Sequence, residues 1–114
     1  MRFMIIVKAS RDSESGELPE PSLFAALAKY HEDLARAGVL LDTNGLQPSS
    51  KGARIRYAGG RRAVVDGPFP ATNELIAGYT LIQAKSCAEA LEWAKRMPAP
   101  AESEIEVREL LEPR

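Results

Sequence analysis

The chain has 114 residues, of which 45% are hydrophobic and 27% charged, and its formal net charge is −1 at pH 7. This length predicts one domain with a modest hydrophobic core. A charge so close to zero argues against a general affinity for nucleic acid or anionic membranes. No apolar run is long enough to span a bilayer, and Cys87, the single cysteine, cannot form an internal disulfide. We therefore expect a cytoplasmic protein that binds neither nucleic acid nor membrane.

The first part of the chain predicts a strand, a helix and a second strand. Residues 2–8 are apolar on both faces near the middle of the run, which is too short for a signal peptide. A polar loop is expected over residues 9–21. Ser22 is a good N-cap for a helix that should end at Gly38, and a strand should begin at residues 39–41. One helix face carries an apolar stripe at helical spacing: Leu23, Leu27, Tyr30 and Leu34.

The middle of the chain predicts a β-hairpin with a basic cluster. Residues 54–57 and 62–65 are strand-like and flank two consecutive glycines, which is a good hairpin signal. Arginines alternate with Ile55 and Tyr57, as expected for a solvated strand face. The cluster could instead meet an anionic ligand or an acidic partner. Its members are Lys51, Arg54, Arg56, Arg61 and Arg62.

A tetrapeptide, Asp66-Gly67-Pro68-Phe69, follows the hairpin. The proline excludes helical geometry at the residue before it, and the Asp66 carboxylate can accept hydrogen bonds from nearby backbone N–H groups. Phe69 provides an apolar anchor. The tetrapeptide is therefore either a rigid turn between two strands or the rim of a pocket that carries one carboxylate.

The last part of the chain completes an α+β fold. Residues 74–83 form the most hydrophobic strand, Ser86 to Glu89 form a capping box that opens a helix, and residues 104–108 alternate as a half-buried strand. The order β-α-β, hairpin, β-α-β predicts a ferredoxin-like split βαβ fold. Its two helices can cover only one face of the sheet, although residues 4–6 and 75–82 are apolar on both. We expect a second copy to cover the other face, in a homodimer.

His31 is the only histidine and lies at the edge of the apolar stripe of the first helix. Its ordinary pKa of about 6.5 suits proton transfer, and Asp42, Asp66 or Glu32 could orient it. A boundary histidine with no chemical role is the other interpretation. One histidine and one distant cysteine do not match a zinc site, and no glycine motif leads into a helix as a phosphate cradle would. We expect no metal and no cofactor.

The sequence resembles small bacterial proteins of the YCII-related, DGPF-type family nearly from end to end. This resemblance implies a dimeric α/β barrel in which two sheets pack face to face. Such proteins often occur beside extracytoplasmic-function sigma factors, which implies a link to transcriptional regulation. Relatives in the broader superfamily are thought to use a His–Asp pair, but their histidine lies nearer the middle of this helix than His31. Besides residues 66–69, the resemblance rests on residues 1–8, 37–41, 45–54, 74–79, 89–94 and 104–108.

Departures from the family pattern decide between two functions. The acid and the base that commonly follow the tetrapeptide are missing from residues 70–74, and Asn44 replaces an acid. We therefore favour a small-molecule-binding or regulatory accessory protein, for which the resemblance implies a link to sigma-factor-dependent transcription. The alternative is a cofactor-independent lyase or isomerase that acts on a small organic acid or ring, with His31 and Asp66 as acid–base residues. The expected ligand-binding residues are Asp42, Asn44, Gly67, Pro68, Phe69 and Glu74.

Overall fold

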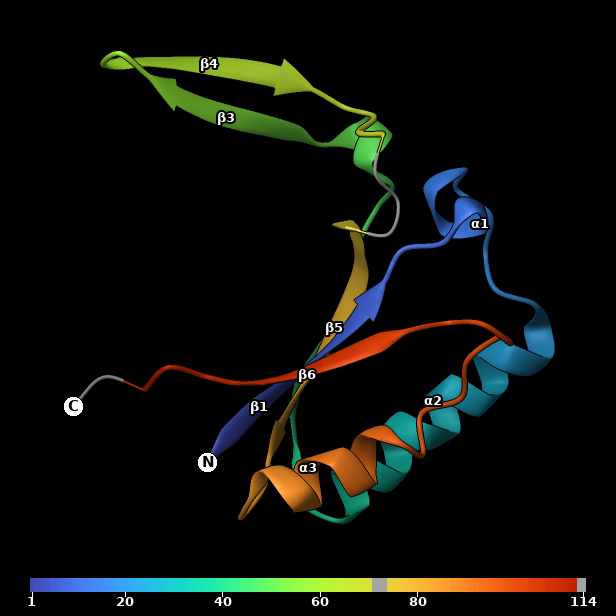
Figure 1. The fold of residues 1–114 in the computed structure, drawn as a ribbon. Helices are drawn as coiled ribbons and strands as arrows, with labels where there is room; N and C mark the ends of the chain where they lie inside the picture. The colour runs from blue at the N-terminus through green and yellow to red at the C-terminus, as the bar shows by residue number, and fades with distance from the viewer. Residues whose placement is uncertain (71–73, 113–114) are drawn as a thin grey trace.

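The structure is a computed structural model that describes residues 1–70 and 74–112. Figure 1 shows a sheet backed by helices and a β-hairpin that projects away from it. In chain order the elements are β1 (Arg2–Lys8), α1 (Arg11–Glu14), α2 (Pro21–Arg36), β2 (Leu40–Gly45), a 3-10 turn (Ser49–Lys51), β3 (Ala53–Ala58), β4 (Arg61–Asp66), β5 (Ile76–Gln83), α3 (Cys87–Ala94) and β6 (Ile105–Glu109).

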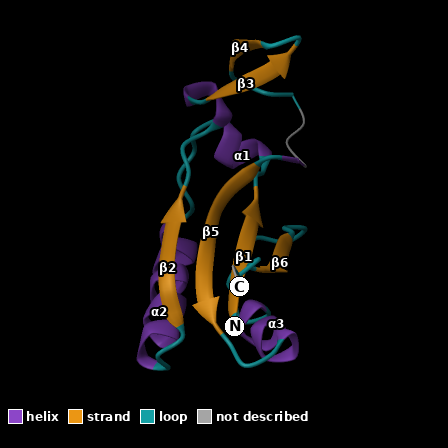
Figure 2. Cartoon of the chain, turned by 90° about the vertical axis from the view of Figure 1, so that its left-hand side faces the viewer, coloured by secondary structure: helices purple, strands orange, loops and turns teal. Residues whose placement is uncertain are grey.

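The main sheet has the strand order β2-β5-β1-β6, and every neighbouring pair is antiparallel. Helices α2 and α3 lie together behind it, so one face of the sheet is uncovered (Figure 2). Two β-α-β units thus interleave their strands, with the hairpin inserted between β2 and β5. This arrangement confirms the predicted ferredoxin-like α+β fold.

The hydrophobic core lies between the sheet and the two helices. Phe3, Ile5 and Ile82 point toward the helices and are at most 1% exposed. Because successive side chains of a strand point to opposite faces, the residues between them lie on the other side, which we call the open face. Its apolar side chains are only half-buried: Met4, Ile6, Tyr79 and Leu81. Apolar residues on both faces of β1 and β5 are as the sequence predicts.

The helices differ from the prediction in two ways: α2 begins at a different residue, and a short helix, α1, was not predicted. Helix α2 begins at Pro21 with Glu20 as its N-cap, so Ser22 lies within the first turn rather than capping it. Proline is well suited to the first helical position because its missing N–H would have no partner there. The segment predicted as a polar loop contains α1, which Ser10 caps through a reciprocal exchange with Ser13.

The hairpin forms a separate two-stranded sheet, and we call residues 53–66 the arm. It extends from the top of the main sheet toward the side that the helices leave uncovered (Figure 1). The predicted alternation is present, but both faces of the arm are solvated. Ile55, Tyr57 and Val64 share one face and are 57%, 72% and 68% exposed. The apolar face of the arm therefore packs against none of the described residues of its own chain.

The tetrapeptide 66–69 joins the arm to the sheet by packing on the backbone around Ser49. The Gly67 N–H donates to the Gly52 carbonyl over 3.0 Å, and the Phe69 N–H donates to Ser49 Oγ over 3.0 Å. A Cβ atom at position 67 would lie 1.8 Å from the Ser49 carbonyl oxygen. From the sequence, the Asp66 carboxylate could accept hydrogen bonds from nearby backbone N–H groups. Among the described residues it accepts none.

Gly67→Ala should lower the free energy of unfolding by about 1–3 kcal/mol, because the new methyl group would overlap the Ser49 backbone and force it to shift. Urea unfolding followed by circular dichroism measures the change. Gly52→Ala is the matched control, since its Cβ would lie at an ordinary 3.6 Å from the same oxygen and its φ is −111°. Equal stability of the two variants would contradict this packing.

Candidate functional site

The predicted site residues fall in three separate places. His31 lies on α2, on the helix side of the sheet. Asp42 and Asn44 lie on β2, at the edge of the open face. The others lie where the arm meets the sheet: Asp66, Gly67, Pro68, Phe69 and Glu74. The structure therefore does not bring His31, Asp42 and Asp66 together around one cleft.

Asp42, Asn44 and Tyr79 form a hydrogen-bonded group that we call the open-face cluster. The Tyr79 hydroxyl donates to Asp42 Oδ2 over 2.8 Å. Asn44 Nδ2 donates to Asp42 Oδ1 over 3.2 Å and to the Tyr79 hydroxyl oxygen over 3.0 Å. The Thr43 N–H also donates to Asp42 Oδ1, over 2.9 Å. Three of these four bonds end on the Asp42 carboxylate and fix it in place on an exposed strand edge.

A register shift in β2 decides which way this carboxylate points. Leu40 pairs with Ile82, whereas Asp42 pairs with Leu81, so Leu41 has no partner of its own. A bulge of this kind takes up one extra residue. With regular alternation, Leu40 and Asp42 would share the helix-covered face. The bulge instead places Asp42 on the open face and Thr43 beneath the helices.

His31 contacts the same strand from the helix side. Its Nε2 lies 3.3 Å from Thr43 Oγ1 and 3.5 Å from Thr80 Oγ1, and the two hydroxyl oxygens are 2.9 Å apart. Burial holds the pKa of His31 below its ordinary value because the charged imidazolium loses hydration. Thr43 thus stands between His31 and Asp42, which lie on opposite faces of the sheet.

A cavity of about 380 Å³ lies at the base of the arm, and we call it the junction cavity. Its lining comes from four separated parts of the chain. Two of them, residues 45–54 and the tetrapeptide, carry the family resemblance, and Glu74 begins a third such segment. The lining residues are Glu14, Leu46, Gln47, Pro48, Ser49, Lys51, Gly52, Arg54, Phe69, Glu74, Leu75 and Ile76.

Three charged residues of this cavity were not among the predicted site residues: Glu14, Lys51 and Arg54. The Glu14 carboxylate accepts hydrogen bonds from the Ser49 hydroxyl and, over 3.0 Å, from the Ser49 N–H, and these bonds lower the pKa of Glu14. The Arg54 guanidinium lies 3.8 Å from the centroid of the Phe69 ring. Arg54 belongs to the basic cluster, but its stacking on Phe69 depends on the fold. No local signal marks Glu14, which lies in the segment predicted as a loop.

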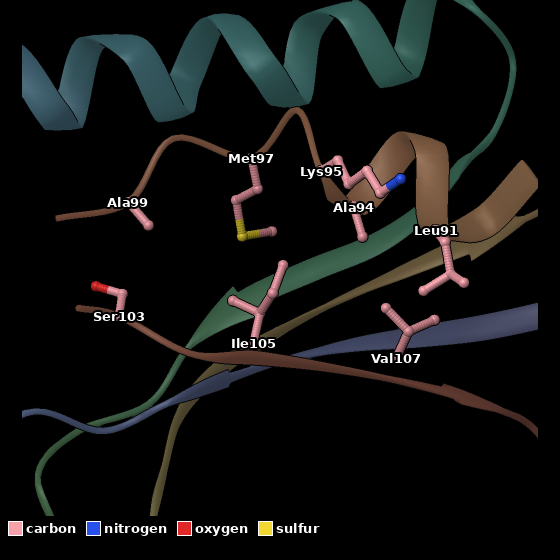
Figure 3. A pocket seen from close by; sticks show the side chains of 8 residues that line it. All are labelled: Leu91, Ala94, Lys95, Met97, Ala99, Ser103, Ile105 and Val107. Carbon is pink, nitrogen blue, oxygen red and sulfur yellow. The ribbon is translucent and has the colours of Figure 1, made fainter. Parts of the chain in front are cut away.

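A second cavity of about 320 Å³ lies between α3 and β6 (Figure 3). Figure 3 shows Met97, Ile105 and Val107 lining it, and it contains no predicted site residue. Over residues 1–70 and 74–112, no three His, Cys, Asp or Glu side chains gather as a metal site would require. No helix in the same ranges has the length and apolar character needed to cross a membrane.

The low pKa of His31 should make the fold less stable as the solution becomes acidic. Below about pH 6.5 the unfolded chain binds a proton at this residue more readily than the folded chain, so the free energy of unfolding falls with decreasing pH. An NMR titration of the imidazole ring should give a midpoint below 6.5. His31→Gln should flatten the stability profile between pH 7 and about 5. A midpoint at or above 6.5 would contradict the burial of this ring.

Comparison with known proteins agrees with the family resemblance of the sequence. The family model for the YCII-related domain matches residues 1–114. The chain is 34% identical over 106 residues to an uncharacterised protein, R00369, of Rhizobium meliloti (strain 1021), an alignment that covers 91% of this chain and 82% of that protein. On this evidence, the chain belongs to the YCII-related family.

Proposed function

We propose that the protein binds a small molecule in the junction cavity and acts as a binding or regulatory accessory protein. The observation that carries this proposal is the convergence of separated segments on one cavity. Most residues of the segment 46–54 line it, together with Phe69 and Glu74, although these three parts of the chain are far apart in the sequence. A turn with a purely structural role would not require polar and charged side chains from three other segments beside it.

The lining favours a small ligand with an apolar body and an anionic group. Leu46, Leu75 and Ile76 supply apolar surface. Lys51 and Arg54 supply positive charge. The carboxylates of Glu14 and Glu74 also line the cavity, but within the described residues neither cation forms an ion pair. A guanidinium can bind a carboxylate through two parallel hydrogen bonds. A small organic acid is therefore the ligand class that we expect.

A regulatory role is supported by where the cavity lies in the chain. Arg54 is in the first part of β3, and Phe69 follows the end of β4. A ligand in the cavity would contact both ends of the arm and could change how the arm is held. We propose that such a change is the signal by which the protein would influence another molecule, including any link to sigma-factor-dependent transcription.

The alternative function, a cofactor-independent lyase or isomerase, has weaker support. A neutral imidazole suits a general base, and the lowered pKa of His31 favours that form. However, His31 Nε2 faces Thr43 and Thr80 beneath the helices, and Thr80 is 1% exposed. Asp66 lies at the base of the arm, where β4 ends. A substrate would have to reach two groups that share no cavity.

Small organic acids that bind the wild-type protein should raise its melting temperature, because they bind the folded state only. Arg54→Gln should remove this shift, since it deletes the charge at the cavity wall. Arg61→Gln is the matched control, because it removes the same charge from the tip of the arm and should keep the shift. Equal shifts in both variants, or no shift from any compound of a broad library of organic acids, would contradict the proposal.

We also propose that the protein is a homodimer in which the open face is covered by a second copy. The open face carries four half-buried apolar side chains and no helix, and soluble monomers rarely leave such a surface uncovered. Light scattering at micromolar concentration should give twice the 12.4 kDa mass of one chain. A stable mass of one chain would contradict this assembly.

A further inference from the structure

The arm lacks the support that a hairpin needs to remain folded. An isolated two-stranded hairpin is marginally stable in water, and the apolar face of this one is exposed at Ile55, Tyr57 and Val64. The radius of gyration is 15.9 Å, compared with about 13 Å for a compact domain of this length. The arm therefore projects from the domain, and the hydrophobic core of its own chain does not stabilise it.

The turn at the tip suits a hairpin that keeps its shape while it projects. Gly59 and Gly60 both have positive φ values, 55° and 75°, which is the geometry of the two-residue turn that matches strand twist. Six-residue strands give the arm a reach of about 20 Å. This reach is directed to the same side of the sheet as the open face (Figures 1 and 2).

The charges of the arm and of the open face are complementary. Arg62 lies on the apolar face of the arm, with its guanidinium 5.2 Å from the centroid of the Tyr57 ring. Among the described residues, neither Arg62 nor Asp42 of the open-face cluster forms an ion pair. At the opposite edge of the open face, by contrast, Glu106 is paired with Lys8 and Arg108. The Asp42 carboxylate is therefore the anionic group that still lacks a cation.

We infer that the apolar face of the arm docks on the open face of a second copy, beside its open-face cluster. Ile55 and Val64 would bury against the partner's half-buried apolar side chains, and Arg62 would supply the cation for Asp42. The open-face cluster is then completed by the other copy. This inference rests on the proposed homodimer but not on the ligand in the junction cavity. It adds a contact between the arm of one copy and the open face of the other to the contact that covers the open face.

The first test is the mass of the assembly as a function of concentration. Val64→Asp should raise the dissociation constant of the dimer at least about tenfold, because it places a charge in a desolvated contact. Ala63→Asp is the matched control, since it adds the same carboxylate to the opposite, solvated face of the arm. Circular dichroism should show both variants folded, because neither position belongs to the core.

The results of this test distinguish the arm contact from the proposed homodimer and from ligand binding in the junction cavity. A monomeric wild-type protein would overturn both the homodimer and the arm contact. A wild-type dimer that Val64→Asp leaves intact would overturn the arm contact alone. Neither result bears on the Arg54→Gln test of ligand binding.

The second test locates the contact by cross-linking between copies. In a Cys87→Ser background, one chain carries Tyr57→Cys and a second chain carries Asn44→Cys. Mixing the two and adding a short bismaleimide should give a covalent heterodimer, because the arm of the first would lie beside the open-face cluster of the second. Absence of the heterodimer, or cross-linking of Tyr57→Cys chains only to one another, would overturn the inference.

Discussion

The central strands of the four-stranded sheet, β1 and β5, are apolar on both faces, but the two helices α2 and α3 cover only one of these faces. This shortage of helices determines how the other parts of the molecule are arranged. One face gains a closed core in which Phe3, Ile5 and Ile82 are almost completely buried. The other keeps half-buried apolar side chains, with polar groups at both edges. Covering a side chain of this size contributes about 1.5–3 kcal/mol, so the uncovered face represents a substantial unused driving force for association.

The backbone around Ser49 is the second organising point. Its carbonyl oxygen excludes any side chain at position 67, its hydroxyl accepts from the Phe69 N–H, and its N–H donates to Glu14. One short turn thereby fixes the base of the arm, the position of Phe69 and the end of α1 together. The junction cavity has a defined lining because these three constraints share a single residue.

The sequence was sufficient for most of the fold, because strand and helix periodicity, glycine turns and the cap at Ser86 are local signals. It also placed His31 correctly at a boundary. It did not reveal that His31 and Asp42 lie on opposite faces, because the bulge at Leu41 depends on pairing with β5. The stacking of Arg54 on Phe69 and the bonds from Ser49 to Glu14 join residues that are distant in sequence. Such contacts depend on how the elements are arranged in space, which local sequence patterns do not predict.

Helix α1 illustrates what a distant anchor implies for the order of folding. Four residues are too few to sustain a helix by backbone hydrogen bonds alone, since nucleation costs more than one turn returns. Its last residue, Glu14, is held by Ser49, 35 positions further along the chain. The segment before α2 can therefore become ordered only after β2 and the turn that follows it are in place. We therefore expect it to be among the last parts of the chain to fold and among the first to open.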